Sequence, residues 1–262
     1  MSRLITAAVL LAVFIPALFF APALLWALLI AGVAAVAAYE WARLSAFPAF
    51  LPKLYGAGMG AMAMIVYLMP GQAEAMLLLF ALAAVFWVLA APLWLAGRWR
   101  GEGVFVRALV GTLLILPTWA AIVALRERSQ WLLLGVMALV WIADSAAYFA
   151  GRRFGRHKLA PEISPGKSWE GVAGAALALV LYASAISAAI IGLRIPGALI
   201  LAAALLYFSI LGDLFESWMK RVAGVKDSGV LLPGHGGVLD RIDALCAALP
   251  IAAGILHFAT WI

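Results

Sequence analysis

Long apolar segments follow one another along almost the whole chain, separated by short polar stretches. Apolar side chains occur on all sides of these segments and do not alternate with polar ones, so helices are predicted rather than a β-barrel. A helix needs roughly 20 apolar residues to cross the hydrocarbon of a bilayer. The pattern therefore predicts an all-α integral membrane protein, a bundle of about nine transmembrane helices. The expected spans are residues 4–20, 22–39, 54–70, 74–96, 108–125, 131–149, 172–192, 196–212 and 243–261.

The composition supports this class of protein. Of the 262 residues, 67% are hydrophobic and only 11% are charged, whereas about a quarter of an average soluble chain is charged. A soluble globular enzyme is therefore excluded. Cys246 is the only cysteine and the three histidines are far apart in the sequence, so neither an intrachain disulfide nor a zinc site is expected.

The basic residues predict an orientation. If the loop at 150–171 is cytoplasmic, alternation of the spans puts all but three of the eighteen Lys and Arg residues on that side; the exceptions are Arg126, Arg128 and Arg194. The positive-inside rule then favours a cytoplasmic N-terminus and an outer C-terminus, in the inner membrane of a bacterium. This also accounts for the net charge of +6 without a nucleic-acid partner. The many Ala and Gly residues in the spans would permit a homodimer.

Polar residues are unevenly distributed between the two halves. Eight of the twelve acids lie between Asp144 and Asp243. We therefore expect residues 1–130 to form a scaffold of helices and residues 131–262 to carry the chemistry.

The first polar cluster contains Asp144, about a turn inside the end of a predicted span. An acid inside a membrane helix costs at least a few kcal/mol unless it is paired or hydrated. It indicates either a functional polar pocket or an ion pair with a nearby base such as Arg152.

The second cluster lies at Ile163–Gly171. Pro165 and Gly166 predict a turn, and Ser168 is a candidate cap of the helix that follows. Lys167, just before a helix start, is well placed to hold a phosphate. An ordinary basic loop is the alternative.

The third cluster is the most informative. Asp213 and Glu216 are three residues apart and so share one helical face, and Asp240 and Asp243 repeat that spacing at the start of the last span. A Gly236–Gly237 turn between the two pairs offers open backbone N–H groups beside His235. Four basic residues lie among these groups: Lys220, Arg221, Lys226 and Arg241.

Such a set of residues suits phosphate chemistry with Mg²⁺. Carboxylates hold Mg²⁺, which keeps several waters and bridges phosphates, while cations and N–H groups hold phosphate oxygens. The alternative is an interfacial loop whose acids and bases only neutralise one another.

From Ser217 to Asp243 the sequence resembles the signature of the phosphatidate cytidylyltransferases, also called CDP-diacylglycerol synthases. The stretch reads Ser217-Trp-Met-Lys-Arg, then Lys226-Asp-Ser-Gly, then Leu-Pro-Gly-His-Gly-Gly-Val-Leu-Asp240-Arg-Ile-Asp243. The segments around Asp144 and at Ile163–Gly171 are also similar, so the resemblance covers roughly residues 140–262. It departs at Gly166-Lys167-Ser168, where the family usually has Lys-Lys-Thr, so one cation is missing there.

The resemblance implies a reaction of CTP with phosphatidic acid that gives CDP-diacylglycerol and pyrophosphate in phospholipid biosynthesis. It implies Mg²⁺ as cofactor, either alone or together with a second cation. The expected catalytic residues are Asp213, Asp240, Asp243 and Lys220, and the expected metal ligands are these three acids with Asp144. The expected substrate-binding residues are Lys167, Ser168, Ser217, Arg221, Lys226, Asp227, His235, Gly236, Gly237 and Arg241.

Two other functions use acids in a membrane protein. A CDP-alcohol phosphatidyltransferase would carry its paired acids close together in one helix motif, whereas here they are split between two spans. An ion-coupled transporter would place acids at the membrane midplane, commonly with internal repeats, and no repeat is visible in this sequence.

Overall fold

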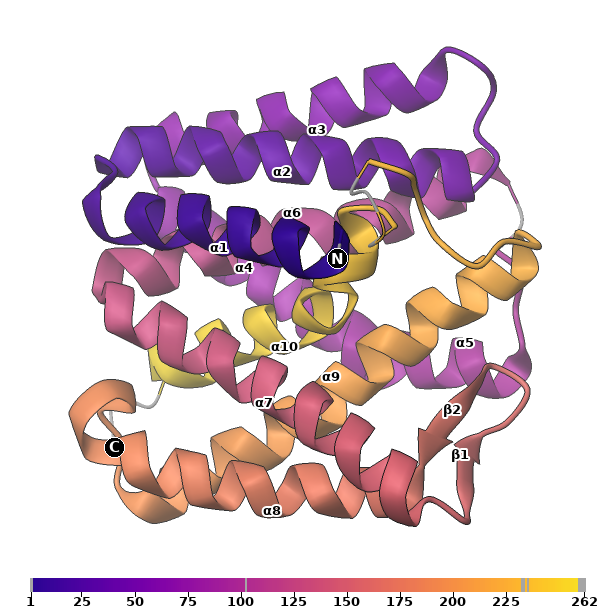
Figure 1. Cartoon of the computed structure of the whole chain (residues 1–262). Coiled ribbons are helices and arrows are strands. Elements are labelled where there is room, and N and C mark those ends of the chain that lie inside the picture. Colours follow the sequence, from indigo (N-terminus) through magenta and orange to yellow (C-terminus); the bar gives the residue numbers. More distant parts are fainter. Residues whose placement is uncertain (1, 102, 232–233, 235, 259–262) are drawn as a thin grey trace.

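Helices make up nearly all of the structure (Figure 1). The computed structural model describes every residue except 1, 102, 232–233, 235 and 259–262. In that part of the chain the α-helices are α1 (Ser2–Phe20), α2 (Ala23–Leu44), α3 (Leu51–Leu68), α4 (Gln72–Val85), α5 (Ala91–Gly97), α6 (Val104–Arg128), α7 (Gln130–Phe154), α8 (Trp169–Ile186), α9 (Ile195–Val222) and α10 (Leu239–Phe258). Two π-helical segments, Phe86–Ala90 and Ser187–Ile191, follow α4 and α8.

The predicted all-α membrane bundle is confirmed. Each of the nine predicted spans overlaps one helix or consecutive helical segments, the last of them as far as the described residues reach, to Phe258. Among the described residues, seven of these are long and apolar enough to cross a membrane, and Ala8–Phe20 adds a shorter apolar helix.

The helix ends differ from the predicted span ends where the sequence becomes polar. Helix α9 continues to Val222 instead of ending at 212, and α7 continues to Phe154 instead of 149. Asp144 therefore lies about three turns, not one, from the end of its helix. Hydropathy marks where apolar residues stop, but a helix can continue through charged residues that pair with one another.

A small hairpin connects α7 to α8. Strands β1 (Lys158–Ala160) and β2 (Ser164–Ser168) pair in antiparallel fashion, so the turn predicted at Pro165–Gly166 is wrong. The chain turns at 161–163 instead, where the N–H of Ile163 bonds to the carbonyl of Ala160. Proline fits position 161 because a turn exploits its fixed φ. The predicted cap is confirmed, since Ser168 Oγ accepts a hydrogen bond from the N–H of Gly171.

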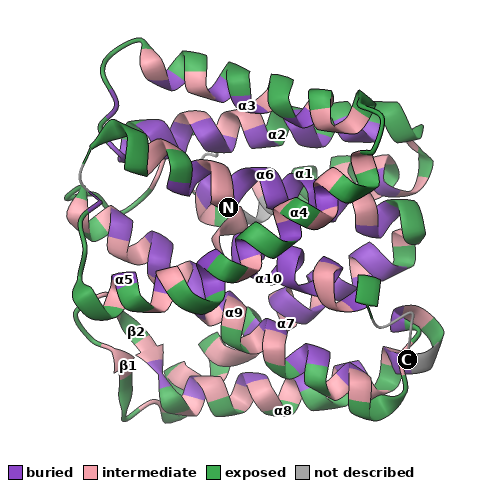
Figure 2. Ribbon diagram, turned by 180° about the vertical axis from the view of Figure 1, so that it is seen from behind, coloured by how far each residue is buried: buried purple, intermediate pink, exposed green. Residues whose placement is uncertain are grey.

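Helices α6 and α10 form much of the buried centre of the bundle (Figure 2). Two indole N–H groups connect sequence-distant helices there: Trp119 donates to the carbonyl of Ala27, and Trp87 donates to that of Cys246. Outer helices such as α3 and α8 expose large apolar side chains, including Ile65 and Leu181. Exposed apolar surface of this kind suits contact with lipid.

Candidate active site

The sequence-predicted polar clusters come together at one end of the bundle. The C-terminal ends of α2, α5, α7 and α9 and the β1–β2 hairpin all lie at this end (Figure 1). A cavity of about 690 Å³ opens between α7, the hairpin, α8, α9 and the start of α10. We call it the acidic cavity. Its charged lining residues are four acids, Asp144, Asp213, Asp240 and Asp243, and four bases, Arg152, Lys158, Lys167 and Arg241.

Asp213, on α9, is held by two partners. Lys167 Nζ lies 2.6 Å from Asp213 Oδ2, and Ser217 Oγ donates to Asp213 Oδ1 at 3.2 Å, one turn further along α9. The Asp213 side chain remains 31% exposed. Asp144 and Asp243 lie close enough to Asp213 for their charges to repel. A cation near such a group of carboxylates stabilises their charged forms.

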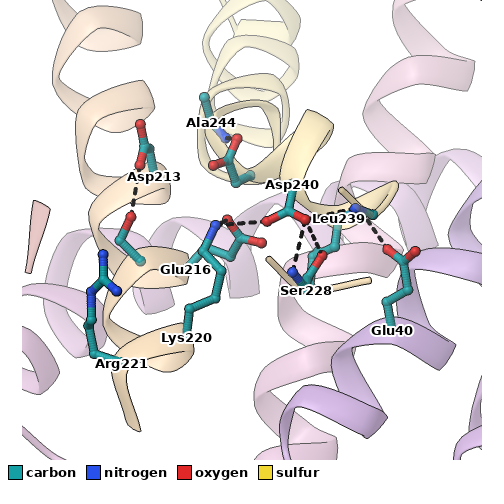
Figure 3. Close-up of polar contacts among 12 residues, drawn as sticks. Glu40, Asp213, Glu216, Lys220, Arg221, Ser228, Leu239, Asp240 and Ala244 are labelled. Carbon is teal, nitrogen blue, oxygen red and sulfur yellow. Dashed lines mark hydrogen bonds and ion pairs between the residues drawn. The ribbon is translucent and has the colours of Figure 1, made fainter. Parts of the chain in front are cut away.

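Lys220 connects α9 to α10 (Figure 3). Its ammonium lies 2.7 Å from Glu216 Oε2 and 2.8 Å from Asp240 Oδ1. The three side chains are almost wholly buried, with exposures of 14% for Lys220, 5% for Glu216 and 4% for Asp240. Removing one member of such a group would leave the others buried without a full set of partners, which is costly.

Asp240 also fixes the loop that precedes α10. Its Oδ2 accepts hydrogen bonds from the N–H and the hydroxyl of Ser228, both at 2.9 Å, and from the N–H of Gly237 at 2.8 Å (Figure 3). With Lys220 on Oδ1, both carboxylate oxygens are engaged by protein donors.

Two neighbouring glycines of this loop, Gly236 and Gly237, have no room for a side chain. Gly236 has a φ of +82°, and a Cβ there would lie 2.6 Å from Asp240 Oδ2. A Cβ at Gly237 would lie 2.5 Å from Glu40 Oε2. Any side chain at either position would therefore displace a carboxylate.

Glu40, from α2, was not among the predicted site residues. It is 4% exposed, and its Oε2 accepts a hydrogen bond of 2.8 Å from the N–H of Leu239, the first residue of α10 (Figure 3). Glu40 directly follows the apolar segment 22–39. An acid that continues a predicted membrane helix is a signal that could have identified it. Its partner is 199 residues away, which local spacing cannot indicate.

The remaining predicted residues are spread more widely. Arg241 lines the acidic cavity, whereas Lys226 and Asp227 line a second cavity. Arg221 is exposed and donates to the carbonyl of Ile163 in the hairpin. His235 lies outside the described residues.

The chemistry of the acidic cavity fits Mg²⁺. Asp144, Asp213 and Asp243 offer carboxylate oxygens to one space, and oxygen is the ligand that Mg²⁺ prefers. Within the described ranges, no three His, Cys, Asp or Glu side chains form a ready-made metal cluster. Mg²⁺ does not need one, because it usually keeps several waters and binds through one or two carboxylates.

Comparison with known proteins identifies the family. Residues 1–259 match the Cytidylyltransferase family. The chain belongs to this family. A phosphatidate cytidylyltransferase of Pseudomonas aeruginosa is 43% identical over 99% of this chain and 98% of its own length.

Two further members of the cytidylyltransferase family match about half of the chain. A phosphatidate cytidylyltransferase of Haemophilus influenzae is 55% identical over 48% of this chain and 46% of its own length. One from Thermotoga maritima is 43% identical over 45% of this chain and 46% of its own length. The resemblance predicted from the motifs is thus confirmed, and it favours cytidylyl transfer over the phosphatidyltransferase and transporter alternatives.

Proposed function

We propose that this membrane protein transfers the cytidylyl group of CTP to phosphatidate and so makes CDP-diacylglycerol in phospholipid biosynthesis. The observation that carries the proposal is the match to a phosphatidate cytidylyltransferase along 99% of the chain, together with an acid-lined cavity at one end of the bundle. One reactant is a lipid and the other is soluble, so the reaction requires a site at the membrane surface.

In the reaction, a phosphate oxygen of phosphatidate attacks the α-phosphorus of CTP, and the bond to the β-phosphate breaks to release pyrophosphate. The nucleophile is already an anion, so no strong general base is needed. The barrier lies in bringing two anions together and in stabilising the leaving group. Cations beside carboxylates suit both tasks.

We propose that Asp144, Asp213 and Asp243 hold Mg²⁺. When bound, the ion would neutralise negative charge on the reacting phosphates. Lys167 and Arg241, which line the same cavity, would hold phosphate oxygens. Ser168 and Ser217 keep a structural contact each, as the cap of α8 and as the donor to Asp213.

Asp240 and Lys220 have a different proposed task. Because both oxygens of Asp240 accept protein hydrogen bonds, it would position Lys220, Ser228 and Gly237 beside the reactants. Direct binding of a metal by Asp240, as expected from the sequence, would require these bonds to rearrange.

The cellular arrangement is part of the proposal. We infer an inner-membrane enzyme with a cytoplasmic N-terminus and site, supported by the excess of Lys and Arg at this end of the bundle. The division into a scaffold at 1–130 and a chemical half at 131–262 stays a prediction, as does a homodimer packed through small residues.

The proposal is tested with purified protein, phosphatidate and each of the four nucleoside triphosphates, with and without Mg²⁺. We expect CDP-diacylglycerol from CTP with Mg²⁺, and little product from the other nucleotides or after chelation. Equal use of all four nucleotides would contradict specific cytidylyl transfer. Absence of any liponucleotide product would contradict the proposed function.

A further inference from the structure

A second cavity, of about 640 Å³, lies beside the loop that precedes α10. It is enclosed by the end of α2, the segment before α6, the end of α9 and the residues after it. We call it the basic cavity. Its polar lining residues are Arg43, Ser45, Arg100, Arg107, Lys226, Asp227 and Ser228. None of its lining residues is shared with the acidic cavity.

The charges in the two cavities differ. The acidic cavity has four acids and four bases and is balanced, whereas the basic cavity has four bases and one acid, a net charge of +3. Cations gathered in a concave space attract an anion and concentrate it there. Arg side chains match phosphate oxygens well, because the guanidinium can donate two parallel hydrogen bonds.

Arg107 lines this cavity and holds two of its backbone segments together. Its guanidinium donates to the carbonyl of Ser45 at 2.6 Å and to that of Gly101 at 2.5 Å, which joins the end of α2 to the segment before α6. Arg43, Arg100 and Lys226 are exposed at the cavity and are the cations available to a ligand.

Ser45, which lines this cavity, has a hydroxyl whose hydrogen-bonding capacity is not used. It is 2% exposed, and its hydroxyl is buried without a hydrogen-bond partner among the described residues. Buried hydroxyl groups in folded proteins usually have a partner. This hydroxyl has almost no accessible surface, so a bound anion would reach it only after the side chain rotates.

The basic cavity is also adjacent to the candidate catalytic residues. Ser228 lines this cavity, while Asp240 lines the acidic cavity, and Ser228 donates two hydrogen bonds of 2.9 Å to Asp240. Only the hydrogen-bonded pair of Ser228 and Asp240 would thus separate an anion in the basic cavity from the acidic cavity.

We propose that the basic cavity binds a phosphate group of one of the two anionic reactants through Arg43 and Arg100 of the N-terminal half. The group is either the polyphosphate of CTP, which is released as pyrophosphate, or the phosphate monoester of phosphatidate. The inference rests on the proposed function and adds two arginines from outside the signature to the expected phosphate-binding residues.

The test compares Arg43→Gln, Arg100→Gln and the double variant with the unaltered protein in the cytidylyltransferase assay. We expect the KM for one reactant to rise about tenfold in each single variant and further in the double variant, as for loss of a charge-assisted hydrogen bond. A rise confined to CTP, with weaker inhibition by added pyrophosphate, identifies the polyphosphate. A rise confined to phosphatidate identifies the lipid.

Two controls separate binding from structure. Arg98→Gln removes a nearby exposed arginine that pairs with Glu162 at 2.5 Å and does not line the cavity, so both KM values should stay within twofold. Arg100→Lys keeps the charge but not the paired hydrogen bonds of the guanidinium, so it should recover only part of the affinity. If neither KM rises in the double variant, the proposal is overturned. The unaltered protein, measured alongside, reports separately on the proposed function.

Discussion

Asp213 and Asp240 belong to one acidic cluster but are held in different ways. Asp213 is 31% exposed and faces the acidic cavity with one ammonium partner. Asp240 is 4% exposed, and both its oxygens accept protein hydrogen bonds. The two residues should therefore respond differently to the same substitution.

Replacing each acid by its amide tests this difference. Asp213→Asn should lower kcat at least about a hundredfold, because one of the proposed Mg²⁺ ligands is lost, with little change in thermal stability. Asp240→Asn should lower activity comparably and also the free energy of unfolding by about 3 kcal/mol, because Lys220 loses a buried partner. Turnover and thermal midpoints in detergent measure both effects, with exposed Glu162→Gln as control. Near-normal turnover of Asp213→Asn would contradict its assignment.

The charged residues could be predicted because charges are rare in this chain. Asp144, Asp213 and Asp243 stand out against apolar sequence, and the structure brings them to one cavity. Glu40 was missed because its partners, Leu239 and the glycine loop, are separated from it by nearly the whole chain.

At the scale of helices, α2 is joined to α10 through Glu40. The carboxylate accepts the N–H of Leu239 at the start of α10 and lies against Gly237. The first N–H groups of a helix have no partner within the helix, so an acid at this position satisfies one of them. Its negative charge is also attracted to the positive end of the helix dipole.

Substitution of Glu40 should loosen the start of α10. Glu40→Ala leaves the buried N–H of Leu239 without its acceptor and should destabilise the protein by about 1–3 kcal/mol. It should also speed proteolysis in the loop at 223–238. Glu40→Gln keeps an acceptor oxygen and should recover much of the loss. Equal stability of Glu40→Ala and the unaltered protein would show that this bond does not hold α10.

The helices could be predicted but their ends could not. Apolar runs predict the helices, seven of which are long and apolar enough to cross a membrane among the described residues. The last turns of α9 are polar and are retained because Lys220 pairs with Glu216 and Asp240. The hairpin was missed because its two short strands have no alternating pattern, and Pro165 suggested a turn.

For the whole molecule, the cavities lie at the end of the bundle where most Lys and Arg residues are found. The positive-inside rule predicts that this end faces the cytoplasm, where CTP would be available. The orientation therefore decides whether the soluble reactant can reach the site.

Cysteine labelling tests the orientation. In a Cys246→Ala background, Gly166→Cys should be protected from an impermeant maleimide in intact cells and react after lysis. Gly166 is exposed, and a Cβ there meets no heavy atom within 4 Å. Arg194→Cys, exposed at the other end of the bundle, should react in intact cells. The reverse pattern would contradict the topology.

The most direct test of the central claim follows the phosphorus atoms of CTP. Purified protein is incubated with phosphatidate, Mg²⁺ and CTP labelled at either the α- or the γ-phosphate, and lipid is separated from water-soluble products. Cytidylyl transfer predicts that the α-label enters the lipid, with one pyrophosphate released for each, and that the γ-label stays in the aqueous phase. Label from the γ-phosphate in the lipid, or no lipid label from either position, would contradict it.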